Sequence, residues 1–194
     1  RTRLGSLKGQ QGFPKNLEWA VVFNQADFIS ESVSNLLNAA LLGGLLATII
    51  LFLFLRDVRS TLIIALSIPV SILATFALMY QTGITLNIMS LGGVALGVGM
   101  LVDNSIVVLE AVDRYRRQGG SVREQVYKGT KEVGAAVTAS TLTTVAVFLP
   151  LVFVEGIAGQ LFRDQALTIT YALLASLAVA LTFIPMALAL EGFA

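Results

Sequence analysis

Asp103 is the residue whose type and position most directly predict chemistry in this sequence. Of the twelve Asp and Glu residues, eleven lie in polar links or near the ends of apolar runs, whereas Asp103 lies inside the run 96–109. If that run crosses a lipid bilayer, an ionised aspartate within it costs at least ~2.5–3.5 kcal/mol. The position therefore predicts an ion or proton site. The alternative is a structural Asp bonded to hydroxyl groups of a neighbouring helix.

Polar side chains that would support such a site lie beside Asp103 and in one other apolar run. Asn104 follows Asp103 directly, and we assign both residues to proton translocation. Hydroxyl groups in the run 133–154 would support a proton relay, with Thr141 and Thr144 as the candidates. The alternative for each hydroxyl is a hydrogen bond to a carbonyl of its own helix.

Four glycines near Asp103 predict that another helix approaches closely. At about 100° per residue, Gly92 and Gly99 share a helical stripe with Asp103. Gly93 and Gly97 share the adjacent stripe with Asn104. Because glycines let membrane helices come into close contact, we expect both polar residues to face protein rather than lipid. The glycines do not form a dinucleotide-binding motif, since the third glycine and a βαβ unit are missing.

Two further carboxylates follow Asp103 in the chain. Glu110 and Asp113 lie about two and three turns beyond it, and they could mark a proton exit. The three arginines at 114, 116 and 117 favour the alternative, in which both carboxylates are interfacial charges.

The composition requires that most of the chain is embedded in a membrane. Hydrophobic residues make up 56% of the 194 residues, charged residues 13%, and the mean hydropathy is +0.81. Ordinary globular chains carry about 25% charged residues. Runs of about 17–25 apolar residues can span a bilayer, and this sequence contains five. We predict an all-α transmembrane helix bundle with spans at 33–55, 62–80, 86–109, 133–154 and 166–190.

The positive charges in the links predict the orientation of these spans. The link 56–61 holds two Arg and the link 113–132 holds six Lys or Arg, whereas the link 81–85 holds none. Because Lys and Arg concentrate on the cytoplasmic side, the link 113–132 is predicted to be cytoplasmic. The N-terminal segment then lies outside, and the C-terminus inside.

The link 113–132 is expected to be partly helical. Gly119 and Gly120 are predicted to break the helix of the span 86–109. The capping-box pattern at 121–124 predicts that a new helix begins there, lies at the cytoplasmic surface and runs into the span 133–154.

The segment 1–30 has a different character from the bundle at 31–194. Residues 17–23 are rich in β-forming types and predict one extramembrane strand. Because a lone strand is not stable, its partners are expected in another subunit or earlier in a longer chain. The lack of an initiator Met agrees with a start partway through such a chain.

The small residue counts exclude several classes of function. The sequence contains no Cys and no His, which excludes disulfides, Cys/His zinc sites and a Ser-His-Asp triad. A net charge of +1 argues against a nucleic-acid partner. No motif indicates a cofactor or a metal.

Several stretches resemble one family of membrane proteins, in order along the chain. The segment around Asp103 reads GMLVDNSIVVLE at 99–110. The other matching stretches are FLRDVRSTLI at 54–63, IPV at 68–70, LNIMSL at 86–91, STLTTVAVFLP at 140–150 and Pro185. Together they resemble the second to sixth transmembrane helices of resistance–nodulation–division (RND) efflux pumps, and the likeness covers roughly residues 20–190.

The resemblance implies a secondary active transporter of the bacterial inner membrane rather than an enzyme. Members of that family use proton entry to export drugs or other solutes. They form homotrimers with a periplasmic adaptor and an outer-membrane channel as partners. On that pattern, the chain is the first-half membrane portion, preceded by the last strand of a periplasmic porter subdomain. Asp103 matches the family's protonatable Asp.

The sequence departs from the family pattern at one position and leaves other readings open. Drug exporters commonly carry two adjacent Asp residues where this chain has Asp103 and Asn104, which puts the number of protons per cycle in doubt. A protein-translocation or lipid-export relative and a non-transport scaffold are alternatives. An intramembrane aspartyl protease would need two facing carboxylates, and the spans supply only Asp103.

Overall fold

The computed structural model describes residues 25–55 and 57–190, and these residues contain helices but no strand. The strand predicted at 17–23 lies outside them. The elements are α2 (Gln25–Leu55), α3 (Val58–Gln81), α4 (Ile88–Arg116), α5 (Val122–Phe148), the short 3-10 helix η1 (Leu149–Phe153) and α6 (Gly156–Leu190).

Four of the predicted spans are confirmed as helices that are long and apolar enough to cross a membrane. They are α3, α4, α5 together with η1, and α6. The apolar stretch described in α2 is shorter and covers Leu41–Ile50. The chain is therefore a multi-pass helical bundle.

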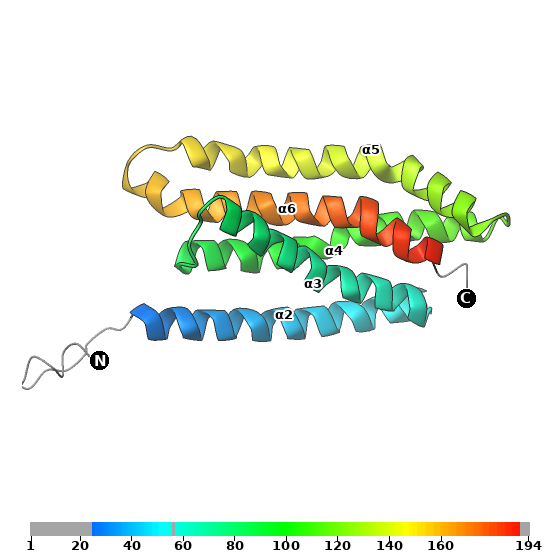
Figure 1. Cartoon of the computed structure of the whole chain (residues 1–194), viewed down its shortest axis with the longest axis horizontal. Helices are drawn as coiled ribbons and strands as arrows, with labels where there is room; N and C mark the ends of the chain where they lie inside the picture. The colour runs from blue at the N-terminus through cyan, green and yellow to red at the C-terminus, as the bar shows by residue number, and fades with distance from the viewer. Residues whose placement is uncertain (1–24, 56, 191–194) are drawn as a thin grey trace, which may run out of the picture.

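Helix α6 lies in the middle of the bundle. It packs against α3, α4 and α5, while α2 lies at the edge against α3 and α4 (Figure 1). The core forms where α3, α4 and α6 meet, and Ile64, Leu109 and Ile184 are each at most 1% exposed there. Large apolar side chains on α2 and on the outer faces of α3 and α5 are exposed, as expected of helices that contact lipid.

Helices α4 and α5 extend beyond the spans that apolar runs predict. Helix α4 continues to Arg116 rather than ending at 109, and α5 begins at Val122 rather than at 133. The link 113–132 is therefore mostly helical. The helix predicted to begin at 121–124 does begin there, where the Ser121 side chain accepts a hydrogen bond from the Glu124 N–H at 3.4 Å. The two helices can continue side by side because Gly129 lies against the α4 backbone, where a Cβ atom would be 2.7 Å from the Cα of Val112. Gly119 and Gly120, with φ of 81° and 117°, form the turn.

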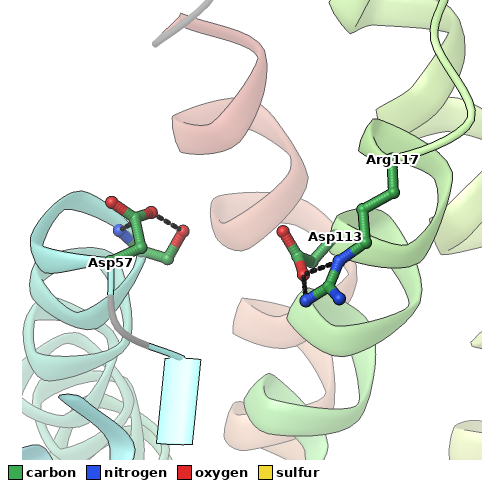
Figure 2. A network of polar contacts seen from close by, with 4 residues as sticks. Asp57, Asp113 and Arg117 are labelled. Atoms are coloured by element: carbon green, nitrogen blue, oxygen red, sulfur yellow. Dashed lines mark hydrogen bonds and ion pairs between the residues drawn. The ribbon is translucent and has the colours of Figure 1, made fainter. Parts of the chain in front are cut away.

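Asp57 caps the N-terminus of α3, at the end of the bundle where the turn between α4 and α5 lies. Its carboxylate accepts hydrogen bonds from the backbone N–H groups of Arg59 and Ser60, at 3.3 and 3.1 Å, and from the Ser60 hydroxyl. Figure 2 shows the Asp57 carboxylate at this helix start. These bonds satisfy N–H groups that a helix start leaves without a partner. The hydroxyl bond is the largest cause that holds the pKa of Asp57 below its usual value of 3.8.

Asp57→Ala is expected to lower the stability of the full-length protein by about 0.5–2 kcal/mol at neutral pH, because α3 loses its cap. Since the pKa of Asp57 is lowered in the folded state, the charged cap stabilises fully above the unfolded pKa and is lost as the pH falls through the folded one. Asp57→Asn is the matched control, because asparagine also caps helices but does not titrate. Thermal unfolding in detergent between neutral and acidic pH measures both effects. A cap role is contradicted if the alanine variant matches wild type.

Candidate functional site

Asp103 lies on a stripe of α4 that no other described helix covers. Its side chain is exposed, and no hydrogen bond or ion pair joins it to the residues that the structure describes. The same stripe contains Leu96 and Val107, which are 52% and 42% exposed, and the exposed Glu110. Because α4 is a candidate membrane span, this stripe would place a bare carboxyl group against lipid unless another helix covers it.

Asn104, the next residue, faces into the bundle and connects three helices. Its Oδ1 accepts a hydrogen bond from the Thr141 hydroxyl of α5 at 3.3 Å. Its Nδ2 donates to the Ser176 hydroxyl oxygen of α6 at 3.4 Å. The Ser176 hydroxyl in turn donates to the carbonyl of Leu101 at 2.7 Å. We call Asn104, Thr141 and Ser176 the three-helix tie.

Ser105 completes the sequence of three polar residues and faces α3. Its hydroxyl oxygen accepts a hydrogen bond from the Ser67 hydroxyl at 3.3 Å, and both residues are 1% exposed. The Ser67 hydroxyl oxygen also lies 2.7 Å from the carbonyl oxygen of Ile64, so its one hydrogen is shared between these two acceptors. Asp103 therefore points away from the other described helices, Asn104 points toward α5 and α6, and Ser105 points toward α3.

The predicted glycine stripes differ in what they contact. Gly93 packs on the α6 backbone, since a Cβ atom there would be 2.8 Å from the carbonyl oxygen of Gln165. At Gly97 a Cβ atom would be 2.6 Å from the Cβ of Ala172. This stripe of α4 therefore lies in close contact with α6. Gly92 and Gly99 meet no atom within 4 Å in the described part of the chain, so their packing role stays a prediction.

The predicted relay hydroxyls do not contact Asp103. Thr141 is 4% exposed and bonds to Asn104. Thr144 donates to the Ser140 carbonyl of its own helix at 3.1 Å, and Thr138 and Thr143 bond backward in the same way. The structure thus places Thr141 in the three-helix tie, while for Thr144 it shows the alternative that the sequence left open.

Ser176 is the member of the three-helix tie that the sequence did not single out. A signal for it exists, because Thr168, Ala172 and Ser176 recur every four residues on α6 and form a small-residue stripe. That stripe meets Gly93, Gly97 and Asn104 in turn. Matching the two stripes would have required knowing that α4 and α6 are neighbours, although α5 separates them in the chain.

Two ion pairs lie near the C-terminal end of α4. Asp113 accepts from Arg117, the residue that follows α4, at 2.9 Å (Figure 2). Arg114 on α4 pairs with Glu132 on α5. The pairing of Asp113 fits the interfacial alternative for this carboxylate, and Glu110 remains exposed on the Asp103 stripe.

The opposite end of the bundle holds a cavity of about 190 Å³ between the first turns of α4 and α6. The Asn87 side chain donates to Asp164 at 2.6 Å across it. Asp103 does not line this cavity, and the contact of Gly93 with α6 closes the seam below it. Among the described residues, no group of three His, Cys, Asp or Glu side chains could hold a metal ion.

This chain matches a family model and is similar to several known proteins. Residues 1–190 match the family model described as the AcrB/AcrD/AcrF family. The swarming motility protein SwrC of Bacillus subtilis is 42% identical over 175 residues, covering 89% of this chain and 17% of the relative. The multidrug resistance protein MdtC of Klebsiella pneumoniae is 38% identical over 186 residues, covering 96% of this chain and 18% of the relative. MdtC of Escherichia coli O139:H28 is 37% identical over the same length.

The chain spans less than a fifth of the length of these relatives, 17–18% in each case. The matches agree with the ordered motifs and confirm the predicted resemblance to RND efflux transporters. The match extends over nearly all of the sequence, including the Asp103 stripe and the three-helix tie. The chain therefore belongs to the AcrB/AcrD/AcrF family.

Proposed function

We propose that this chain is the first-half membrane portion of an efflux transporter that is driven by the proton-motive force, and that Asp103 carries the proton. The observation that supports this most strongly is the position of Asp103, which is exposed between the apolar residues Leu96 and Val107 of its α4 stripe and has no partner in the described chain. The relatives named for multidrug resistance support export of drugs or other solutes.

The proposed coupling depends on a partner outside this chain. A cationic side chain from the rest of the protein pairs with ionised Asp103 in one state. At about 4 Å such a pair is worth about 4 kcal/mol at an effective dielectric constant of 20. Protonation removes this attraction, so the two states of the transporter differ in whether the pair is made. The proton does not reach Asp103 between α4 and α6, because these helices are in close contact at Gly93 and Gly97.

The three-helix tie makes α4 move together with α5 and α6. Because Asn104 adjoins Asp103 and bonds to both neighbours, a change at Asp103 shifts the packed group rather than one helix alone. Rigid movement of such a group is a common way to amplify a local charge change.

The whole transporter is proposed to follow the family pattern. It lies in the bacterial inner membrane as a homotrimer, with the segment before α2 on the periplasmic side and the end of α6 on the cytoplasmic side. A periplasmic adaptor and an outer-membrane channel are its partners. The six basic residues of the segment 113–132 support this orientation.

Reconstitution of the full-length protein tests the proposed function. Proteoliposomes with an imposed pH gradient are expected to move a fluorescent dye substrate and to release protons in exchange. Collapsing the gradient with a protonophore is expected to stop both fluxes. Dye movement that continues unchanged without a gradient would contradict proton coupling.

A further inference from the structure

The three-helix tie fixes which way hydrogen bonds run around Asn104. The Ser176 hydroxyl has one hydrogen, and it is committed to the Leu101 carbonyl at 2.7 Å. Toward Asn104, Ser176 therefore presents only lone pairs and needs a donor, which the Nδ2 group supplies at 3.4 Å. On the other side, the Thr141 hydroxyl donates to Oδ1 at 3.3 Å. Position 104 thus requires a donor toward α6 and an acceptor toward α5.

A neutral carboxylic acid could replace the amide in this arrangement, but a carboxylate could not. A protonated Asp has one O–H donor and one carbonyl acceptor, whereas an ionised Asp has acceptors only. An ionised Asp at 104 would face the lone pairs of Ser176. Ser176 and Thr141 are 0% and 4% exposed, so water does not readily take the place of the missing donor.

The surrounding packing prevents an easy change of this arrangement. Two turns before Asn104, Gly97 lies against Ala172 so closely that no added methyl group fits. Leu101, whose carbonyl holds the Ser176 hydroxyl, is 2% exposed. The side chain at 104 must therefore satisfy the hydrogen bonds of α5 and α6 in their present positions.

We infer that Asn104 acts as a permanent substitute for a protonated carboxyl group. It is a positioning residue that holds α4 to α5 and α6 in every protonation state, and it leaves Asp103 as the single proton carrier of this pair. The inference rests on the proposed function and specifies it further, because it assigns one proton per cycle to the pair rather than two.

Few charged groups face position 104, so its hydrogen bonds are set mainly by Thr141 and Ser176. On α4 the adjacent titratable residue is Asp103, and Glu110 follows after six residues. Helix α5 has no titratable residue after Glu132, and on α6 the nearest to Ser176 is Tyr171. Helix α3 has none between Arg59 and Tyr80.

Asn104→Asp in the full-length protein is the direct test. We expect its transport rate, divided by the wild-type rate at the same pH, to stay near one at about pH 5.5 and to fall about tenfold or more by pH 8, because the new carboxyl must be protonated to keep both contacts. The transport rate of this variant should also depend on proton concentration more steeply than that of wild type, by one additional proton. Asn104→Leu, which matches the size without polar groups, is expected to lose transport at every pH.

A second measurement covers the case in which the aspartate variant folds poorly. Its unfolding temperature in detergent is expected to approach the wild-type value at acidic pH and to fall below it as the pH rises. The inference would be overturned if neither quantity changed with pH: the transport rate of Asn104→Asp relative to wild type, and the difference between their unfolding temperatures. This outcome is distinct from failure of the proposed function, which would appear as transport by Asp103→Asn.

Thr141 and Thr144 provide a matched pair on one helix. Thr141→Val removes a donor of the three-helix tie, whereas Thr144→Val removes only a bond to the Ser140 carbonyl of α5 itself. Transport is expected to fall about threefold or more in the first variant and to stay near wild type in the second. Equal transport in the two variants would argue against the tie.

Discussion

Asp103→Asn is expected to abolish substrate efflux by the full-length transporter while leaving its folding and membrane insertion intact. The amide has nearly the shape of the carboxyl group but cannot exchange a proton at physiological pH. Because no described residue forms a hydrogen bond or ion pair with the Asp103 side chain, the substitution removes none of these bonds from the described part of the bundle. Proton release and dye transport in proteoliposomes, compared with thermal unfolding in detergent, separate loss of function from loss of structure.

Asp113→Asn is the matched control for this experiment. It makes the same chemical change ten residues further along α4, where the carboxylate pairs with Arg117 at an exposed position. Exposed pairs of this kind contribute about 0–1 kcal/mol, so transport should stay near wild type. Proton-coupled export that persists in Asp103→Asn would refute the assignment of Asp103, and loss of export in both variants would instead indicate a general effect of charge on α4.

The bundle was largely predictable because apolar runs report membrane helices directly. Four predicted spans correspond to α3, α4, α5 with η1, and α6. The apolar runs stop seven residues before the end of α4 and start eleven residues after the beginning of α5, because polar residues continue both helices. The glycine pair 119–120 and the capping-box pattern at 121–124 nevertheless predicted the break between the two helices and the start of α5. The continuation depends on contacts between the helices, such as Gly129 against Val112, which hydropathy does not report.

The residues of the candidate site could be identified from the sequence, but the directions in which their side chains point could be predicted only in part. A carboxylate in an apolar run is visible in any sequence, and helical spacing correctly separated the stripe of Asp103 from that of Asn104. Spacing alone does not say which stripe meets a neighbour within the chain. The structure shows that Gly93 and Gly97 meet α6, whereas the stripe of Asp103 is open in the described chain. Whether another helix covers the stripe of Asp103 depends on residues outside the described part of the chain.

Gly97→Ala is expected to destabilise the full-length protein by about 1–3 kcal/mol through overpacking between α4 and α6. The added methyl group would lie 2.6 Å from the Cβ of Ala172, which is itself 2% exposed. Elsewhere in a helix the same substitution is favourable by about 0.8–1 kcal/mol, so a loss of stability here must come from the helix contact. Gly43→Ala is the control, because its added Cβ atom meets nothing within 4 Å.

A compensating substitution shows whether that contact is the cause. Ala172→Gly in the Gly97→Ala background removes the methyl group that the new one would strike, so the pair of changes moves one methyl group from α6 to α4 at constant volume. The unfolding temperature in detergent should recover most of the loss, and because the three-helix tie lies two turns away, transport should recover with it. If the double variant is no more stable than Gly97→Ala, the two residues do not limit the approach of α4 and α6. Recovery of stability without recovery of transport would instead show that the spacing of this seam also sets the geometry of the tie.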